Sequence, residues 1–339
     1  MLDLFPSREA SPFGRRLKRE RGARIPVTVV TGFLGAGKTT LIRRFLKSPE
    51  GQGTAVIVNE FGAVGIDDAL VREAAEATVL LGNGCLCCIT RTDLQVALRR
   101  LVVDRERGTA PPFARVLIET SGLADPAPIL QTFSTDRALG GEFHIDVVLA
   151  VVDAVNGEAA LADAAEARKQ VILADRLIIS KTDLATAATV EALTRHLQQL
   201  NPRAAIDIAV AGVLEPNRIV EPATRERSSF IAEAEHGDGI ASFVLEGENP
   251  IQWPAFSRAM ETLIALRGPD LLRVKGLLNV TGCRGPVVVQ YVQHLSHPPV
   301  ELEAWPDENR SSRVVFITRN MRERQVRDLF AAVQALAKE

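Results

Sequence analysis

Residues 32–39 read Gly-Phe-Leu-Gly-Ala-Gly-Lys-Thr and fit the phosphate-binding pattern G-x-x-x-x-G-K-[ST]. An apolar run precedes this segment and a helical pattern follows it, which is the order that the pattern requires. The glycines let backbone N–H groups surround a β-phosphate at a helix N-terminus. Lys38 would bridge the β- and γ-phosphates, and the Thr39 hydroxyl would bind Mg²⁺. The nucleotide-binding residues expected in this segment are Gly32, Gly35, Ala36, Gly37, Lys38, Thr39 and Thr40.

A second segment, Ser180-Lys-Thr-Asp183, is a variant of the pattern N-K-x-D. The Asp183 carboxylate only accepts hydrogen bonds, so it suits the N1–H and 2-amino groups of guanine, a pair that adenine does not offer. The stem of Lys181 would pack over the ring. Ser180 replaces the usual asparagine, so a tethering amide is lost. The segment predicts guanine as the base.

The third segment is Glu119-Thr-Ser-Gly122, at the end of an apolar run. A Glu119 carboxylate beside the phosphate loop would hold Mg²⁺ through water, and the Gly122 N–H would lie near the γ-phosphate. We predict an enzyme that hydrolyses GTP to GDP and phosphate. Slow intrinsic turnover is expected, because no obvious catalytic glutamine or arginine follows these elements.

Three thiols are crowded into Cys85-Leu-Cys87-Cys88, after Gly82-Asn-Gly. The spacing is too compressed for a closed structural zinc site, so at least one coordination position stays open. Such a site suits Zn²⁺ or Cu(I) best and Co²⁺ acceptably. Three buried small side chains and a redox switch are the alternatives.

Two carboxylates, Glu60 and Asp67, lie where P-loop GTPases place the segment that senses the γ-phosphate. Either could contact Mg²⁺, position water or add a ligand to the thiolate-bound metal, with Glu60 as the candidate ligand. A solvated loop carboxylate is the alternative for each. The candidate catalytic residues are Lys38, Glu60, Asp67 and Glu119.

Composition bounds the possible partners. The net charge of −2, with 46% hydrophobic and 24% charged residues, gives no bulk attraction to nucleic acid or anionic membrane. No apolar run approaches the roughly 20 residues that span a bilayer. Residues 1–24 are basic but lack the apolar core of a secretory signal, so a disordered arm or a docking tail is expected. Adjacent cysteines pair poorly, which favours reduced thiols in the cytoplasm.

Apolar β-branched runs alternate with helical stretches from residue 25 onward, which predicts an α/β fold: a mostly parallel P-loop sheet with helices on both faces. A smaller C-terminal α+β domain follows. The expected domains are a basic arm at 1–24, a GTPase domain at 25–213, a linker at 214–239 and the C-terminal domain at 240–339. The expected strands are 27–31, 55–59, 78–81, 115–119, 147–153, 176–180 and 206–210, then 241–245, 271–280, 287–292 and 313–317, with helices at 38–46, 93–104, 189–200, 253–266 and 322–337.

The order and spacing of these motifs resemble the CobW family of metal-handling GTPases. The resemblance runs from about residue 25 to the end, and its motifs are those at residues 32–40, 59–62, 84–88, 119–126, 180–183, 271–276 and 315–317. It implies GTP hydrolysis, metal bound by Cys85, Cys87 and Cys88, and delivery of the metal to a client protein. One departure is that only His236 remains of the family's histidine-rich stretch, so an auxiliary storage site is not expected.

The leading hypothesis is a GTP-driven zinc metallochaperone. A cobalt-handling GTPase, for a corrinoid pathway or for metalloenzyme activation, stays open, and so does a redox-sensing GTPase that uses Cys85 and Cys88. A small-molecule kinase shares the phosphate loop but leaves Ser180–Asp183 unexplained. The sequence leaves the oligomeric state open.

Overall fold

The computed structural model describes residues 24–58, 77–80, 91–109, 111–220, 234–235, 240–292, 295–296, 299–305 and 308–336. The chain divides into two compact units. The first is Arg24–Phe230, and the second begins at Ile231. This division falls inside residues 214–239, the segment expected as a linker.

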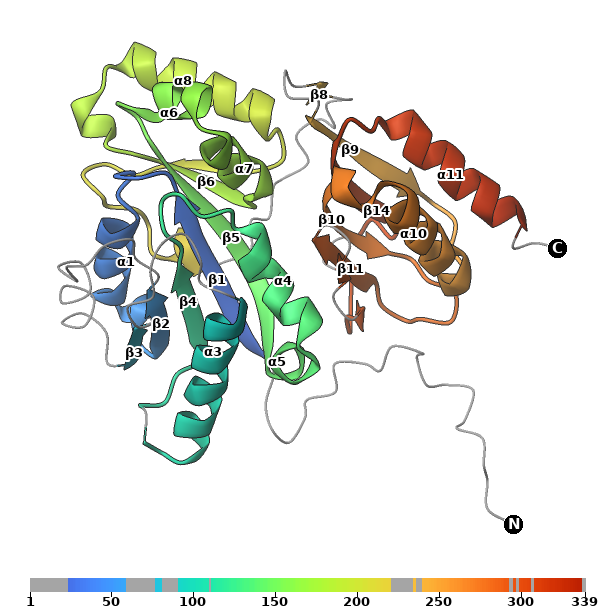
Figure 1. The fold of residues 1–339 in the computed structure, drawn as a ribbon, viewed down its shortest axis with the longest axis horizontal. Coiled ribbons are helices and arrows are strands. Elements are labelled where there is room, and N and C mark those ends of the chain that lie inside the picture. The colour runs from blue at the N-terminus through green and yellow to red at the C-terminus, as the bar shows by residue number, and fades with distance from the viewer. Residues whose placement is uncertain are drawn as a thin grey trace. The chain divides into compact units, whose positions relative to one another are not determined.

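The first unit is built on a seven-stranded sheet in the order β3-β2-β4-β1-β5-β6-β7. Every pairing in it is parallel. The central strand β1 therefore lies between β4 and β5 (Figure 1). Its C-terminal end leads into the phosphate loop, residues 32–37, which connects β1 to α1. The strands are β1 (Ile25–Gly32), β2 (Thr54–Val58), β3 (Ala77–Leu80), β4 (Arg115–Glu119), β5 (Phe143–Asp153), β6 (Arg176–Ser180) and β7 (Ala205–Ile208).

Helices cover both faces of this sheet. Val151 of β5 faces a core that contains Leu41 and Phe45 of α1, whereas its neighbour Val152 faces Val171 of α7 on the other side. Successive side chains of a strand point to opposite faces, so the almost continuous apolar character of β5 reflects burial on both sides. The predicted P-loop fold is confirmed. The helices are α1 (Lys38–Leu46), α3 (Arg91–Glu106), α4 (Ala127–Thr135), α5 (Arg137–Glu142), α6 (Gly157–Asp163), α7 (Ala165–Leu173), α8 (Ala187–Leu200) and α9 (Asn217–Val220).

Most strand boundaries differ from the sequence expectation by one or two residues, and β5 and β7 show why. β5 begins at Phe143 rather than at residue 147, because its first residues alternate between buried and half-buried and pair with the start of β1. β7 ends at Ile208 rather than at residue 210. Val210 instead forms a bridge with Val213 across a tight turn, which ends the strand.

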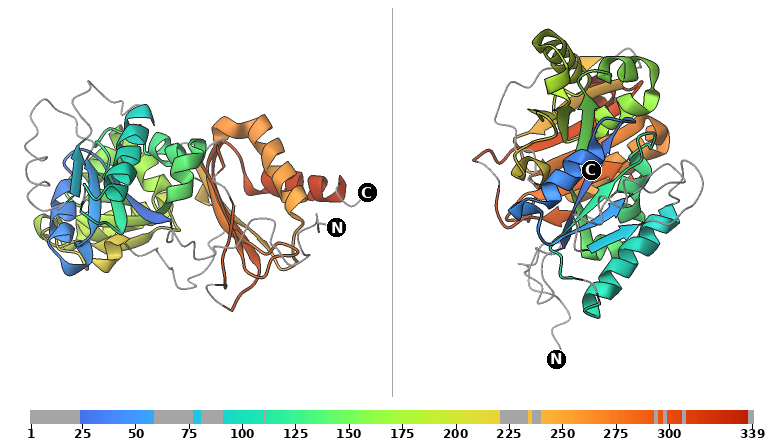
Figure 2. Two further views of the ribbon diagram at one scale, coloured as in Figure 1. Left: turned by 90° about the horizontal axis from the view of Figure 1, so that it is seen from below. Right: turned by 90° about the vertical axis from the view of Figure 1, so that its left-hand side faces the viewer.

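The second unit is a smaller α+β domain, as predicted. Its antiparallel sheet has the order β12-β11-β10-β14-β9-β8, with β13 paired to β11. Helices α10 (Trp253–Arg267) and α11 (Glu323–Leu336) lie on one side of the sheet (Figure 2), where Phe256 and Val326 join the core around Phe316. The strands are β8 (Ala234–Glu235), β9 (Ile240–Gly247), β10 (Leu271–Leu278), β11 (Val287–Val292), β12 (Leu295–Ser296), β13 (Val300–Glu301) and β14 (Ser312–Arg319).

None of the helices in the described part of the chain combines the length and the apolar character needed to cross a membrane.

Candidate nucleotide-binding site

The phosphate loop joins β1 to α1 in a conformation that glycine makes possible. Gly32 has φ 140°, and a Cβ atom there would lie 2.3 Å from the carbonyl oxygen of Val151. The end of β1 therefore packs directly on β5. Gly37 precedes α1 with φ 93°, and no side chain caps the helix. A helix N-terminus without a side-chain cap favours the binding of an anion.

Lys38 is folded back over this loop. Its ammonium donates hydrogen bonds to the carbonyl oxygens of Gly32 at 2.9 Å and Phe33 at 3.2 Å, and only 8% of the residue is exposed. The positive charge is therefore held inside the curve of the loop, where the sequence pattern predicts the phosphates.

The two residues expected to hold Mg²⁺ are adjacent in the structure. The Thr39 hydroxyl, from the first turn of α1, donates to Glu119 Oε1 at the end of β4 over 2.7 Å. Glu119 is 4% exposed. A hydroxyl and a carboxylate are hard oxygen ligands of the kind that Mg²⁺ prefers, so the pair fits the metal.

Gly122 places the loop after β4 directly against the phosphate loop. A Cβ atom at this position would lie 2.6 Å from the backbone nitrogen of Leu34. Two side chains of α7 bind this loop. The Gln170 amide donates to the carbonyl oxygens of Gly122 and Ala124 at 3.1 and 3.0 Å, and Lys169 forms an ion pair with Asp125.

Sequence reasoning did not identify Gln170 or Lys169. They lie more than 40 residues from their partners along the chain, within a helix that carries no recognisable motif. Gln170 is 1% exposed. A glutamine at a core position of a short helix is the one sequence signal that could have pointed to a buried polar contact.

The predicted base-recognition segment is tied to the phosphate loop. The Ser180 hydroxyl donates to the carbonyl oxygen of Ala36 over 2.6 Å. Replacing asparagine by serine was expected to remove a tether, but the shorter side chain makes one itself. The tether forms because β6 ends beside the loop, and Ser180 is 6% exposed.

Asp183 is exposed and faces the turn that follows β7, just beyond the strand expected at 206–210. Its Oδ1 atom accepts the N–H of Ala211 at 3.0 Å. Ala211 and Gly212 both have positive φ, 48° and 75°. A Cβ atom on Gly212 would lie 3.1 Å from the Thr40 side chain, so the turn packs on α1. The turn therefore lies beside Asp183. An Ala-Gly pair after an apolar run is the sequence signal that could have predicted this turn.

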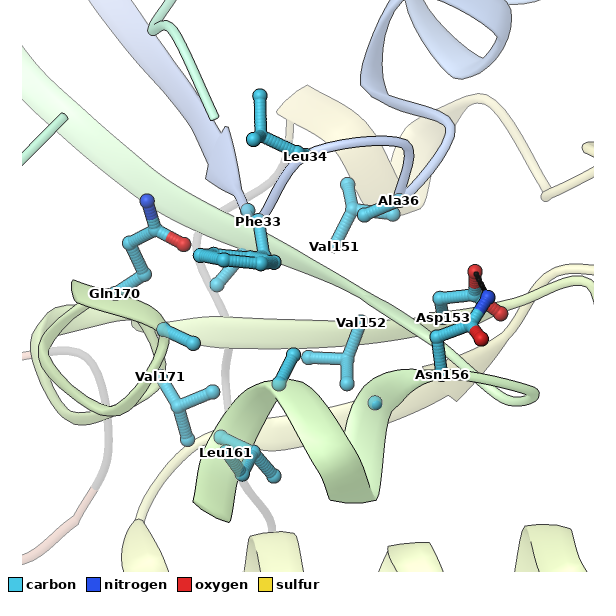
Figure 3. A pocket seen from close by; sticks show the side chains of 15 residues that line it. Phe33, Leu34, Ala36, Val151, Val152, Asp153, Asn156, Leu161, Gln170 and Val171 are labelled. Atoms are coloured by element: carbon cyan, nitrogen blue, oxygen red, sulfur yellow. Dashed lines mark hydrogen bonds between the residues drawn. The ribbon is translucent and has the colours of Figure 1, made fainter. Parts of the chain in front are cut away.

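A cavity of about 30 Å³ lies between the phosphate loop, β5, α6 and α7 (Figure 3). Phe33, Val152 and Leu161 are among the side chains that line it. Its volume is sufficient for about one water molecule, so it is not the place of a nucleotide. Gln170 and Asp153 lie at its edge.

The predicted metal ligands Cys85, Cys87 and Cys88 lie outside the described residues, as do Glu60 and Asp67. Within the ranges that the structure describes, no group of three or more histidine, cysteine, aspartate or glutamate side chains is arranged to hold a metal ion. Those five assignments therefore remain predictions.

Two family profiles match this chain, one for each unit. The nucleotide-binding domain shared by CobW, HypB and UreG matches residues 26–207, and the C-terminal domain of the cobalamin synthesis protein CobW matches residues 240–334. The chain belongs to the CobW family. The resemblance inferred from the motifs is thereby confirmed.

Relatives in the CobW family align over almost the whole chain. The zinc chaperone YjiA of Escherichia coli K12 is 37% identical over 323 residues, which is 91% of this chain and 99% of the relative. The zinc chaperone CobW of a Sinorhizobium species is 31% identical, over 94% of this chain and 99% of the relative. A crystal structure of the Zn(II)-bound YjiA GTPase from E. coli superimposes with a TM-score of 0.65 at 33% identity, over 92% of this chain and 99% of that one.

Proposed function

We propose that this CobW-family protein is a zinc metallochaperone in which the nucleotide state controls Zn²⁺ binding and delivery to a client protein. The chain is a GTPase: it carries the family's nucleotide-binding domain, and its relatives include a zinc-regulated GTPase metalloprotein activator of Schizosaccharomyces pombe.

The observation that carries the nucleotide assignment is the joining of three separate motifs in one site. Thr39 contacts Glu119, and Gly122 lies against the phosphate loop. Ser180 contacts Ala36 on the same loop. These residues come from the ends of β1, β4 and β6, where parallel sheets place their ligands. A simple glycine turn before a helix would not bring a carboxylate and a base-recognition segment to the same loop.

Each residue then has a distinct task. The N–H groups at the start of α1 would bind the β-phosphate, and Lys38 would exchange its two carbonyl partners for phosphate oxygens. Thr39 and Glu119 would hold Mg²⁺, which when bound neutralises charge on the phosphates. The Gly122 N–H would contact the γ-phosphate. Asp183 would accept hydrogen bonds from guanine, and slow intrinsic turnover is expected.

The proposed cargo site is Cys85, Cys87 and Cys88, with Glu60 as a candidate further ligand. Thiolates with an open position allow a metal to enter and leave, which a carrier needs and a structural site does not. The names of the relatives support zinc over cobalt. Because disulfide formation would abolish the site, we place the protein in a reducing compartment, the cytoplasm.

A zinc titration tests this proposal. The protein is loaded with Mg²⁺ and either a GTP analogue or GDP, and Zn²⁺ affinity is measured against a chromophoric chelator. The Cys85→Ser/Cys87→Ser/Cys88→Ser variant removes the proposed ligands. Cys283→Ser is the matched control, because it removes the remaining cysteine, which lies in the second unit.

Nucleotide-dependent zinc affinity that disappears in the triple variant and survives in Cys283→Ser supports the metallochaperone. Equal, weak zinc binding in both nucleotide states contradicts it. Tight nucleotide-dependent Co²⁺ binding in the same assay would favour the cobalt alternative. A reversible oxidation that changes nucleotide affinity without metal would favour a redox sensor.

A further inference from the structure

Asp153, at the end of β5, is a buried carboxylate that no motif of the nucleotide site includes. It is paired in register with Ser180 on the neighbouring strand β6 and is 6% exposed. Its Oδ2 atom accepts the Lys181 ammonium at 2.7 Å and the Asn156 amide at 3.0 Å, while Oδ1 accepts the Val155 N–H at 2.8 Å. Figure 3 shows Asp153 and Asn156 together at the edge of the cavity.

The pair formed by Asp153 and Lys181 is ionic. Burial alone would raise the pKa of Asp153, but hydrogen bonds from Lys181, Asn156 and Val155 outweigh it and hold the pKa below the ordinary value of 3.8. The side chain of Lys181 is 34% exposed and that of Asp153 is 7% exposed. Because the carboxylate is buried, salt screens the pair less than it would a pair at the surface.

The backbone of Lys181 is also constrained, because it adopts an uncommon conformation. Its φ of 56° is left-handed, which is uncommon for a residue other than glycine and persists only where the surroundings enforce it. Among the described residues, the non-glycine residues with positive φ are Lys181, Ala211 and Asn320. The first two belong to the base-recognition part of the site. The Lys181 carbonyl accepts the N–H of Leu184 at 3.0 Å, and the preceding Ser180 is tied to the phosphate loop.

We propose that Asp153 is a positioning residue for base recognition, which holds the Lys181 ammonium so that the lysine stem stays where guanine packs. The stem is fixed at both ends, by the backbone at one end and by the carboxylate at the other. Little of the freedom of a long side chain then remains to be lost when the base arrives. This inference rests on the proposed role of Ser180–Asp183.

The competing explanation is that Asp153 only closes the turn at the end of β5, through Val155 and Asn156. The two roles predict different losses. A positioning role affects only the part of the affinity that depends on the base. A structural role would distort the phosphate loop as well, because Ser180 connects β6 to that loop.

The test measures GDP and pyrophosphate affinity in the full chain, by displacement of a fluorescent GDP analogue. Asp153→Asn removes the charge and keeps the shape. Lys181→Met keeps the stem and removes the ammonium. The double variant completes a double-mutant cycle. Asn156→Ala is the matched control, because it removes another donor to the same oxygen and leaves the ion pair intact.

We expect each single variant to weaken GDP binding about tenfold and the double variant to weaken it no further, as two members of one interaction do. Pyrophosphate affinity and the Asn156→Ala variant stay within about twofold of the wild type. Wild-type GDP affinity in Asp153→Asn overturns the inference. Equal losses for GDP and pyrophosphate, or additive losses in the double variant, also overturn it.

Failure of the proposed function would look different. A wild-type protein that does not discriminate GDP from pyrophosphate refutes the role of Ser180–Asp183 itself. If Asp153→Asn does not fold, Lys181→Met decides alone, because it leaves Asp153 and the turn in place. An unchanged GDP affinity in that variant refutes the inference.

Discussion

Substituting Gly122 by alanine tests whether the loop after β4 must lie against the phosphate loop for catalysis. Gly122 is not one of the described glycines with positive φ, so alanine can adopt its backbone conformation. The obstacle is space alone. The new methyl group would lie 2.6 Å from the nitrogen, 2.7 Å from Cα and 2.8 Å from Cδ2 of Leu34. Two of these three atoms are backbone, so a side-chain rotation cannot relieve the contact.

The size of the effect follows from these distances. Ordinary contact begins at 3.4 Å, so the phosphate loop must move away by about 0.8 Å. A misplacement of about 1 Å in an active site can cost about a hundredfold in rate. We expect kcat/KM for GTP to fall roughly 10- to 100-fold in Gly122→Ala, with a loss of about 1–3 kcal/mol in the free energy of unfolding. Steady-state phosphate release and thermal unfolding measure the two quantities.

The matched control is Gly141→Ala, in α5 of the same unit. A Cβ atom at Gly141 meets no atom within 4 Å. Alanine in a helix is more stable than glycine by roughly 0.5–1 kcal/mol, so this variant should unfold at the same or a higher temperature and keep its rate. If Gly122→Ala hydrolyses GTP at the wild-type rate, the close approach of Gly122 to Leu34 does not position the phosphate loop for catalysis.

Asn201→Ala should lower the free energy of unfolding of the nucleotide-free protein, measured in urea, by about 2–4 kcal/mol. The reason is that the buried Asn201 amide donates hydrogen bonds to three carbonyl oxygens at the end of α7, at 2.8, 3.2 and 2.9 Å. An unchanged urea midpoint would contradict that account. Burial tends to raise the pKa of Asp136, but backbone N–H groups of α5 and the Arg99 guanidinium hold it below its ordinary value of 3.8. Since this pKa is lower in the folded state, the carboxylate stabilises the fold above pH 3.8, and the contribution is lost as the pH falls through the folded value. Asp136→Ala should therefore cost about 1 kcal/mol at pH 7, and melting curves should show that its gap to the wild type narrows below pH 3.8 and not above it.

The helices and strands around the phosphate loop could be predicted because their sequence signals are local. The bounds of α1 are those expected, since Leu41, Ile42, Phe45 and Leu46 recur at helical spacing and all face the core. The approach of Thr39 to Glu119 followed from a simpler rule. Glu119 ends β4, and Thr39 follows the loop that leaves the neighbouring parallel strand β1; the C-terminal ends of such strands meet at one edge of a sheet.

The contacts that organise the site could not be predicted, because their partners are distant in sequence and belong to no motif. Ser180 and Ala36 are 144 residues apart, and Lys181 and Asp153 are 28 apart. Which polar residue meets which depends on strand order and register. A sequence pattern gives the direction of a side chain along its own element and says nothing of its partner. The roles of the three clustered thiols remain predictions from sequence.

The place of β1 at the centre of the sheet has a consequence for biosynthesis. Val29 pairs with Val148 of β5, a strand that is translated roughly 120 residues later. A ribosome that adds about 5–20 residues per second needs roughly 6 to 24 s to cover that distance. The other neighbour, β4, is also translated after β1, because Val29 pairs with Ile118 about 90 residues later. For most of that interval β1 therefore has neither neighbour, and its apolar residues must be shielded from other chains. The GTPase unit therefore completes the pairing of its central strand only after the fifth of its seven strands has been translated.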